Sequence, residues 1–124
     1  MNALSLGELE HAIMTYIWGR GQTVTVPEVH AHLTQTRKLA YTTTMTVMSR
    51  LAEKELLGRR EERRPYTYWA AAKPEDYSAG LMLGVLEEVG DRAATLARFV
   101  ERIGEGEAQL LAELVGEARR RRRR

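Results

Sequence analysis

One stretch of the chain, Thr42 to Leu57, constrains the fold most, because its residues divide into two faces of a single helix. At about 3.6 residues per turn, an apolar stripe runs along one side of that helix. This apolar face consists of Thr44, Val47, Met48 and Leu51. The opposite face carries mainly short hydroxyl side chains, and it consists of Thr42, Thr43, Thr46, Ser49, Arg50 and Glu53. We therefore expect the apolar face to be buried in a core.

The hydroxyl side chains of this helix have two interpretations. Threonine lowers helix propensity, so a face that needed only solubility would more often carry Glu and Lys. Short hydroxyls allow close approach to a polar partner, donate to phosphate oxygens and contact base edges or a thymine methyl group. The alternative is an ordinary helix start, where Ser and Thr are common. This segment alone leaves both interpretations open.

Two shorter helices are predicted before this stretch. Apolar residues at helical spacing predict a helix over residues 6–18, ended by Gly19 and Gly21, and residues 23–25 alternate like a short strand. Thr25 and Glu28 have the spacing of a capping box, with Pro27 in the first turn, so we expect a second helix over residues 26–35. A short helix followed closely by one with an exposed polar face is typical of a helix-turn-helix.

After residue 58 the pattern changes to that of a hairpin. Residues 59–61 and 66–70 are predicted to be its strands, and residues 62–65 form a charged tip. Its basic residues include Arg63 and Arg64, which we expect to contact phosphates, although charges on strand edges also simply resist aggregation. Tyr66 and Tyr68 are expected to pack the hairpin onto the helices rather than to stack on nucleobases. Three helices and a basic hairpin predict a winged helix.

The second half of the chain has a different charge. Residues 1–73 carry a net charge of +3, residues 74–118 carry −7, and residues 119–124 are six arginines. The acidic segment has three short apolar helical stripes, which pairing with a second copy would bury, or which fold back onto the first domain. We expect a homodimer. The residues predicted to form its interface are Leu81, Val85, Leu96, Phe99, Val100, Leu110 and Leu114.

The predicted fold class is therefore mostly α (α+β), a winged helix-turn-helix domain with a C-terminal helical dimerisation region. The expected organisation is a DNA-binding domain over residues 1–73, a helical dimerisation region over residues 74–118 and a disordered arginine tail over residues 119–124. The tail adds non-specific attraction to polyanions or has no dedicated role.

Composition and motifs argue against several other classes. The chain has no cysteine, no apolar run of about 18 residues and no pattern of a secretory signal, so we expect a cytoplasmic protein. His30 and His32 point apart on a helix, so no metal site is expected. Because no phosphate-binding loop or catalytic triad pattern is found, we expect no enzyme, no cofactor and no small-molecule substrate.

The sequence resembles the penicillinase-repressor family (BlaI/MecI/CopY type), in its actinobacterial branch. The residues that carry the resemblance are LGELEHAIMTYIW, EVHAHL and TTTMTVMSRLAEKELL in the three helices and RRPYTYWA in the hairpin. Together they extend over residues 6–115. The resemblance implies a sequence-specific transcriptional repressor that binds double-stranded, palindromic operator DNA as a homodimer, often to control antibiotic resistance.

The resemblance also assigns residues. Thr43 and Thr46 match recognition-helix threonines, Arg50 belongs to an Arg-Leu pair of the family, and Arg64 and Tyr68 match the wing. With the helix and wing reasoning above, the predicted DNA-binding residues are Thr42, Thr43, Thr46, Arg50, Arg63 and Arg64.

Regulation by proteolysis is implied in the same way. Relatives are released from DNA when a membrane sensor metalloprotease system triggers cleavage between Asn and Phe in the dimerisation region. The matching bond here is Arg98–Phe99, which keeps the Phe and lacks the Asn. Copper sensing in the family uses a cysteine-rich tail, and this chain has no cysteine.

Two other functions remain as alternatives to a repressor. The first is a winged-helix module that binds a protein rather than DNA. The second is RNA binding through the aromatic residues and the arginines, although no single-strand platform is evident.

Overall fold

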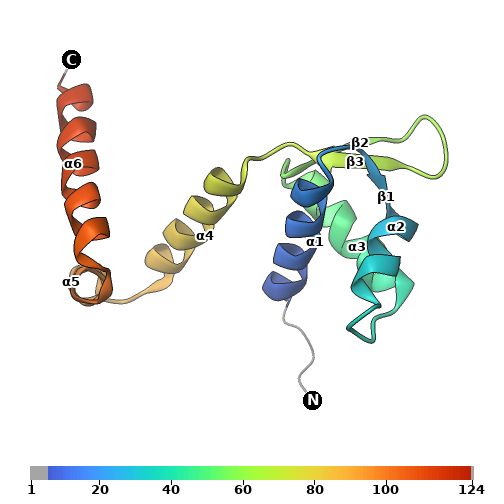
Figure 1. The fold of residues 1–124 in the computed structure, drawn as a ribbon, viewed down its shortest axis with the longest axis horizontal. Helices are drawn as coiled ribbons and strands as arrows, with labels where there is room; N and C mark the ends of the chain where they lie inside the picture. The colour runs from blue at the N-terminus through green and yellow to red at the C-terminus, as the bar shows by residue number, and fades with distance from the viewer. Residues whose placement is uncertain (1–5, 124) are drawn as a thin grey trace. The chain divides into compact units, whose positions relative to one another are not determined.

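The computed structural model describes residues 6–123, and the chain divides into two compact units, residues 1–79 and 80–124. The first unit contains α1 (Leu6–Arg20), β1 (Val24–Thr25), α2 (Val26–Leu33), α3 (Tyr41–Glu53), β2 (Leu57–Arg60) and β3 (Thr67–Ala70) (Figure 1). It ends with the start of α4 (Pro74–Glu88), which continues into the second unit. This order of helices and strands is the predicted winged helix.

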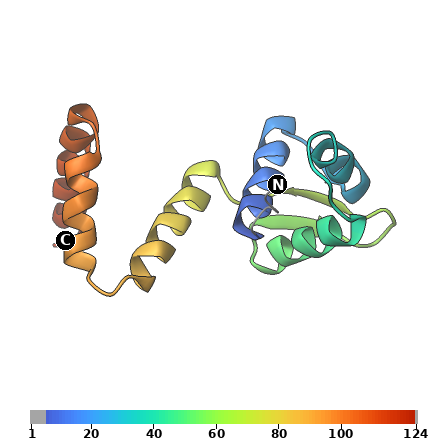
Figure 2. The ribbon, with the colours of Figure 1, turned by 90° about the horizontal axis from the view of Figure 1, so that it is seen from below.

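The three strands form one antiparallel sheet in the order β1-β3-β2. Tyr68 in the central strand pairs with Val24 on one side and with Arg59 on the other. Side chains alternate between the two faces of a strand, so Leu57 and Tyr68 face the helices, where both are buried. The loop between β2 and β3 extends beyond the helices (Figure 2). This hairpin, β2 to β3 with its loop, is the wing.

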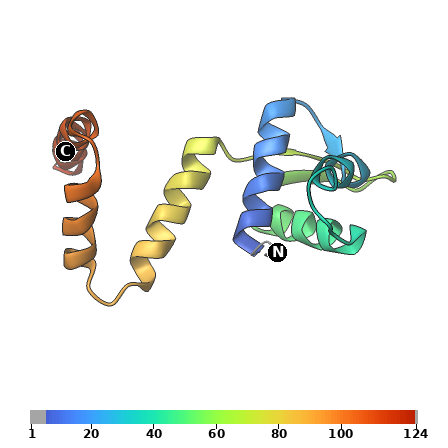
Figure 3. The ribbon, with the colours of Figure 1, turned by 60° about the horizontal axis from the view of Figure 1, so that its bottom comes forward.

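The core of this unit lies between the three helices and the sheet, and α1 packs against α3 (Figure 3). Its buried apolar residues are Leu9, Ile13, Met14, Ile17, Val24, Val26, Val29, Leu33, Val47, Met48, Leu51, Leu57, Tyr68 and Tyr77. The prediction that Thr44, Val47, Met48 and Leu51 form the buried face of α3 is confirmed. Thr44 is fully buried, and its Oγ1 lies 2.9 Å from Nδ1 of His30 in a hydrogen bond. That bond satisfies the one polar side chain of the buried stripe.

The start of α2 agrees with the capping pattern in the sequence. Thr25 is the N-cap residue, and its hydroxyl accepts a hydrogen bond from the backbone N–H of Glu28. Pro27 lies in the first turn, where its missing N–H leaves no intrahelical hydrogen bond unmade. The helix ends at Leu33, slightly earlier than residue 35, and the Thr34 hydroxyl donates to the carbonyl of His30 at this end.

The end of α3 differs from the sequence expectation. A helix to residue 57 is wrong, because α3 ends at Glu53 and Leu57 begins β2. The N–H of Leu56 bonds to the carbonyl of Leu51, and that of Glu55 bonds to the carbonyl of Ala52. This is a Schellman motif, which requires a left-handed residue, and Glu55 has φ of 66°. Such a position usually holds glycine, so the sequence carried no stop signal there.

The boundary between the two units also differs from the expected one at residue 73. The first turn of α4 belongs to the winged helix, because Tyr77 is buried against α1. Its ring lies 5.5 Å from that of Trp18, in an edge-on arrangement, and 6.2 Å from that of His11. Trp18 also donates a hydrogen bond from Nε1 to the carbonyl of Ala72 at 2.9 Å. These contacts extend the first unit to Ala79.

We predict that Tyr77→Phe stabilises the protein. The Tyr77 hydroxyl is buried and has no hydrogen-bond partner among residues 6–123, so removing it is expected to raise the unfolding free energy by about 1 kcal/mol. Burial, and then the charge of Glu10, raises the pKa of Tyr77. The neutral phenol is therefore favoured in the folded state. Its contribution to the free energy of unfolding is lost as the pH rises through the pKa that Tyr77 has in the folded protein.

Urea unfolding of Tyr77→Phe and of the unchanged protein, at neutral pH and at about pH 11, tests this prediction. Tyr41→Phe, which removes an exposed hydroxyl, is the control and should change stability little. The Tyr77→Phe protein should also lose less stability at alkaline pH. A variant that is less stable than the unchanged protein at neutral pH would contradict the prediction.

The second unit contains the rest of α4, α5 (Arg92–Arg102) and α6 (Glu105–Arg122). Asp91 caps α5 by accepting from the N–H of Ala94 at 3.0 Å. Neither α5 nor α6 has a buried residue among those described. Ten large apolar side chains of this unit are exposed, and they are Leu81, Met82, Leu83, Val85, Leu96, Phe99, Val100, Leu110, Leu114 and Val115. The unit therefore lacks a hydrophobic core of its own within the described residues.

The arginine run is helical rather than disordered as far as the structure describes it. The sequence expectation of a disordered tail over residues 119–124 is corrected for residues 119–122, which form the last turn of α6, while residue 124 lies outside the described residues. Glu105 and Glu107 occupy the first turn of the same helix. Acidic residues at the start of a helix and basic residues at its end both interact favourably with the helix dipole, which offsets the repulsion between the arginines. Within residues 6–123, no helix is both long enough and apolar enough to cross a membrane.

Candidate nucleic-acid interface

The exposed face of α3 carries the predicted contact residues. Thr42, Thr43, Thr46 and Arg50 are all exposed, whereas the opposite face of the same helix is buried. The N-cap position of α3 is occupied by Ala40, whose side chain makes no capping hydrogen bond. The threonines therefore do not serve as the cap, and the ordinary explanation for hydroxyls at a helix start does not account for the exposed Thr42 and Thr43. We call Thr42, Thr43, Thr46 and Ser49 the hydroxyl face.

Arg59 ties the wing to this helix. Its Nη1 donates to Oγ of Ser49 at 3.0 Å, and its Nε lies 2.7 Å from Oε1 of Glu61. The guanidinium also lies over the ring of Tyr68, 5.9 Å from its centre. Hydrogen bonding with Tyr68 raises the pKa of Arg59, with a smaller contribution from Glu61 and an opposing one from burial. Arg59 therefore links β2 to α3 through its charged guanidinium.

Arg64 lies in a groove between the wing and α3. The groove is lined by Val26, Pro27, Tyr41, Met45, Ser49, Arg59, Arg64, Pro65, Tyr66 and Tyr68. The guanidinium of Arg64 lies 5.1 Å from the centre of the Tyr66 ring, an attraction between a cation and a π face that favours one orientation of the side chain. The fold thus brings an exposed arginine of the wing into the same groove as Ser49 of the hydroxyl face, 15 residues earlier in the sequence.

Arg63 lies on the other side of the wing. It lines a second pocket with Arg60, Thr67 and Trp69, which shares only Pro65 with the groove that holds Arg64. Trp69 covers Gly58, where an added Cβ would lie only 2.2 Å from the indole ring. Gly58 thus permits the indole to lie flat against β2. The two arginines that the sequence grouped at the tip therefore face different sides.

Two features of this surface were not assigned from the sequence. Arg59 was given no role from the sequence, which singled out only Arg63 and Arg64 among the basic residues of the hairpin. The alternation of side chains along β2 could have indicated this role. Arg59 lies on the same face of β2 as Leu57, and it pairs with the buried Tyr68. Tyr41 and Met45 were also missed, and both are 43% exposed. Their helical spacing places them beside the hydroxyl face, and this spacing could have indicated that they belong to the same surface.

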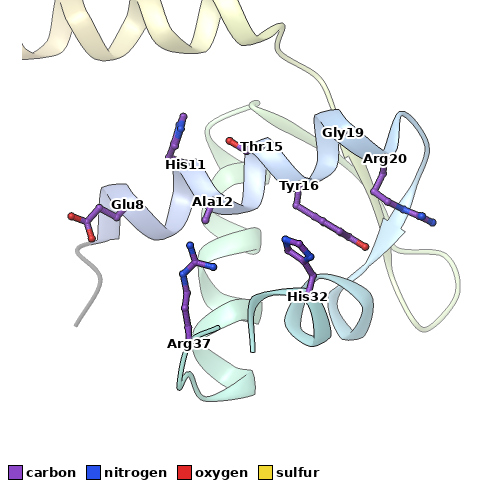
Figure 4. Close-up of a pocket in the computed structure, with 9 residues that line it drawn as sticks. All are labelled: Glu8, His11, Ala12, Thr15, Tyr16, Gly19, Arg20, His32 and Arg37. Carbon is purple, nitrogen blue, oxygen red and sulfur yellow. The ribbon is translucent and has the colours of Figure 1, made fainter. Parts of the chain in front are cut away.

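A second groove lies between α1 and α2 (Figure 4). It is lined by Glu8, His11, Ala12, Thr15, Tyr16, Gly19, Arg20, His32 and Arg37, none of which belongs to the hydroxyl face. Figure 4 shows Tyr16 of α1 and His32 of α2 facing each other, and their ring centres are 4.3 Å apart. His32 therefore packs α2 against α1. Among residues 6–123, no cluster of three or more His, Asp or Glu side chains is arranged to hold a metal ion.

The residues predicted to form a dimer interface are all exposed in the second unit. The exposed fractions of Leu96, Phe99 and Val100 in α5 are 46%, 42% and 50%. These three residues lie on one face of the helix, because they are three and four positions apart. Arg98 points elsewhere and forms an ion pair with Glu101 at 3.2 Å. The Arg98–Phe99 bond lies within the helical part of α5.

Comparison with known proteins supports the same interpretation. The family model of the penicillinase repressor matches residues 6–117. The chain is 42% identical, over 115 residues, to the transcriptional regulator BlaI of two Mycobacterium tuberculosis strains, CDC 1551 / Oshkosh and H37Rv. That match covers 90% of this chain and 83% of each relative.

A solved structure agrees with the fold of the first unit. The solution structure of the DNA-binding domain of the repressor BlaI is 27% identical to this chain, with a TM-score of 0.51. The match covers 60% of this chain and 87% of that domain. With the family model matching nearly the whole length of the sequence, the chain belongs to the penicillinase repressor family.

Proposed function

We propose that this DNA-binding transcriptional repressor recognises a palindromic operator as a homodimer. Each protomer would place α3 in the major groove of one half-site and the wing on the adjacent phosphates. The observation that carries the proposal is the hydroxyl face. A helix buried on one side presents exposed threonines on the other, and Ser49 of the same face lines a groove with Arg64, an exposed arginine of the wing. We place its action in the cytoplasm, where operator DNA is accessible.

The residues of α3 and the wing divide by the chemistry of their contacts. Thr42, Thr43 and Thr46 are short enough to meet base edges in the major groove and to donate to phosphates. Arg50, Arg63 and Arg64 supply positive charge for phosphate oxygens, which sets affinity on all sequences. Arg59 is already bonded to Ser49 and Glu61, so we assign it to holding the wing in place.

Homodimerisation is supported by the second unit. Its helices expose apolar side chains, and the described residues of α5 and α6 include none that is buried. Helices of this length are marginal in water unless an apolar face is covered. A second copy has the same face, so a two-fold dimer covers both at once. Two winged helices joined in this way match the two halves of a palindrome.

Release from DNA is proposed to follow cleavage of Arg98–Phe99 by a membrane sensor metalloprotease system, with genes of antibiotic resistance among the targets. A protease needs an extended segment, and this bond is helical, so cleavage requires α5 to unfold locally. Because Phe99 would be covered in the dimer, cleavage also requires the interface to open, which leaves a second unit that lacks a core of its own among the described residues. If target genes are induced in cells while the repressor stays full length on an immunoblot, this part of the proposal is wrong.

The two types of contact predict different effects of substitution. Arg64→Ala should lower affinity on every sequence and reduce the slope of log affinity against log salt by about one per protomer, because one phosphate contact is lost. Thr46→Ala should leave the salt slope unchanged and reduce discrimination at one base pair of each half-site by roughly fivefold or more.

Fluorescence anisotropy with the duplex upstream of the neighbouring genes and with single-base variants of it, over a range of salt, measures both effects. Arg20→Ala is the charge-matched control, because Arg20 is exposed and lines the groove between α1 and α2. Equal losses from Arg64→Ala and Thr46→Ala on all sequences would contradict the assigned roles. No binding of the full chain to any duplex at low salt would instead favour a protein-binding module, which the family match disfavours.

A further inference from the structure

One methionine of the winged helix, Met45, is placed differently from Met14 and Met48. Met14 and Met48 are fully buried in the core, whereas Met45 is 43% exposed. Met45 is three residues after Thr42 and four before Ser49, so it lies directly beside the hydroxyl face of α3. Met45 is therefore a partly exposed thioether at the edge of a polar helix face, outside the buried core. Its exposed part is available to whatever the hydroxyl face contacts.

The surroundings of Met45 indicate what it meets. It lines the groove between α3 and the wing, together with Tyr41, Ser49, Arg64 and Tyr66. Arg64 on one wall of this groove is suited to a phosphate, and the hydroxyl face is suited to base edges. A side chain that lies between them on a helix in the major groove points at the base edges rather than at the backbone.

We propose that Met45 recognises thymine in each operator half-site by packing against its 5-methyl group. This proposal rests on the proposed function, and it adds a residue that reads one base. In the major groove, thymine is the base that presents an apolar group, while the other edges present hydrogen-bond donors and acceptors. A thioether cannot satisfy those polar groups, and it is flexible enough to adapt its shape to a methyl group. Met45 therefore favours thymine over cytosine at the same position.

The test uses duplexes selected by the full-length protein from a random library, with each thymine then replaced in turn by deoxyuridine. This change removes only the methyl group and keeps the base-pairing and hydrogen-bonding edges. For the unchanged protein, one symmetric pair of positions should lose about fourfold in affinity for each methyl contact, as expected for one buried methyl group. Met45→Ala should bind the thymine duplex more weakly and be indifferent to deoxyuridine at that pair.

Met45→Leu provides the matched control, since it keeps an apolar side chain and should keep the sensitivity to deoxyuridine. Met45→Gln keeps the length of the side chain and should lose it. Because Met45 is exposed, all three variants should melt at nearly the temperature of the unchanged protein, which circular dichroism checks.

The proposal is overturned if no thymine replacement distinguishes the unchanged protein from Met45→Ala, or if Met45→Gln retains the full sensitivity. Failure of the proposed function has a different signature. The selection would then enrich no duplex, and the full chain would bind all sequences alike, which would overturn both proposals together.

Discussion

The Phe99→Asp protein is expected to be a monomer in solution and to bind its operator at least about a hundredfold more weakly than the unchanged protein. Phe99 is 42% exposed in a helix without any buried residue. In a dimer it would be an aromatic anchor, a type of residue that contributes strongly to interfaces. An aspartate there would bring a charge into each half of the contact surface, where burial without a partner is unfavourable.

The loss of DNA affinity follows from the loss of the second protomer. Two linked DNA-binding domains bind a palindrome with an effective concentration that raises affinity by about a hundredfold to ten-thousandfold over a single domain. A monomer keeps its hydroxyl face and its wing, so its preference among bases should not change. None of the exposed apolar residues of the second unit belongs to the core of the first. The winged helix of the variant should therefore melt as before.

Sedimentation velocity and anisotropy titration with a full palindrome and a single half-site measure these effects. Ala94→Asp is the matched control, because it adds the same charge to α5 on the face away from Leu96, Phe99 and Val100. Near the N-terminus of α5, that aspartate is also compatible with the helix dipole. If Phe99→Asp remains a dimer at low micromolar concentration, with unchanged operator affinity, the second unit does not join the protomers through this face.

Salt should affect dimerisation and DNA binding to different extents. Residues 80–118 carry a net charge of −5, but the six arginines that follow bring the second unit to +1, so screening should change its association little. Binding to DNA releases counterions and is weakened by salt.

The parts of the fold that depend on local sequence patterns were predictable from the sequence. The buried face of α3 was correct because helical spacing separates Val47, Met48 and Leu51 from the threonines. The N-cap at Thr25 was correct because the cap and its partner are local in sequence. The wing followed from a change of period and a charged tip. Each of these signals depends on neighbours within a few residues.

The features that sequence did not predict depend on contacts between distant residues or on unusual backbone. The end of α3 depends on Glu55 in a left-handed conformation, for which a glutamate gives no indication. The extension of the first unit into α4 depends on Tyr77 packing against Trp18, 59 residues earlier in the chain. The hydrogen bond from Arg59 to Ser49 depends on the strand register, which brings the wing beside α3.

Tyr68→Ala is expected to destabilise the winged helix by about 3–5 kcal/mol, a large part of the stability of a small domain. Tyr68 is 2% exposed and is the central residue of the sheet, paired with Val24 in β1 and with Arg59 in β2. Its ring fills the space between the sheet and the helices and also supports the guanidinium of Arg59. Alanine leaves a cavity there and removes the ring over which the Arg59 guanidinium lies.

Chemical denaturation of Tyr68→Ala and Tyr68→Phe separates the two roles of this residue. Phenylalanine keeps the packing and removes the hydroxyl beside Arg59, so the loss of stability should be only about 1 kcal/mol. A Tyr68→Ala protein as stable as the unchanged one would contradict the assignment of Tyr68 to the core.

DNA affinity distinguishes this residue from the contact residues: Tyr68→Ala should lose affinity together with its folded fraction on warming. Arg64→Ala should lose affinity at every temperature while melting normally, because Arg64 is exposed and acts on the DNA rather than on the fold.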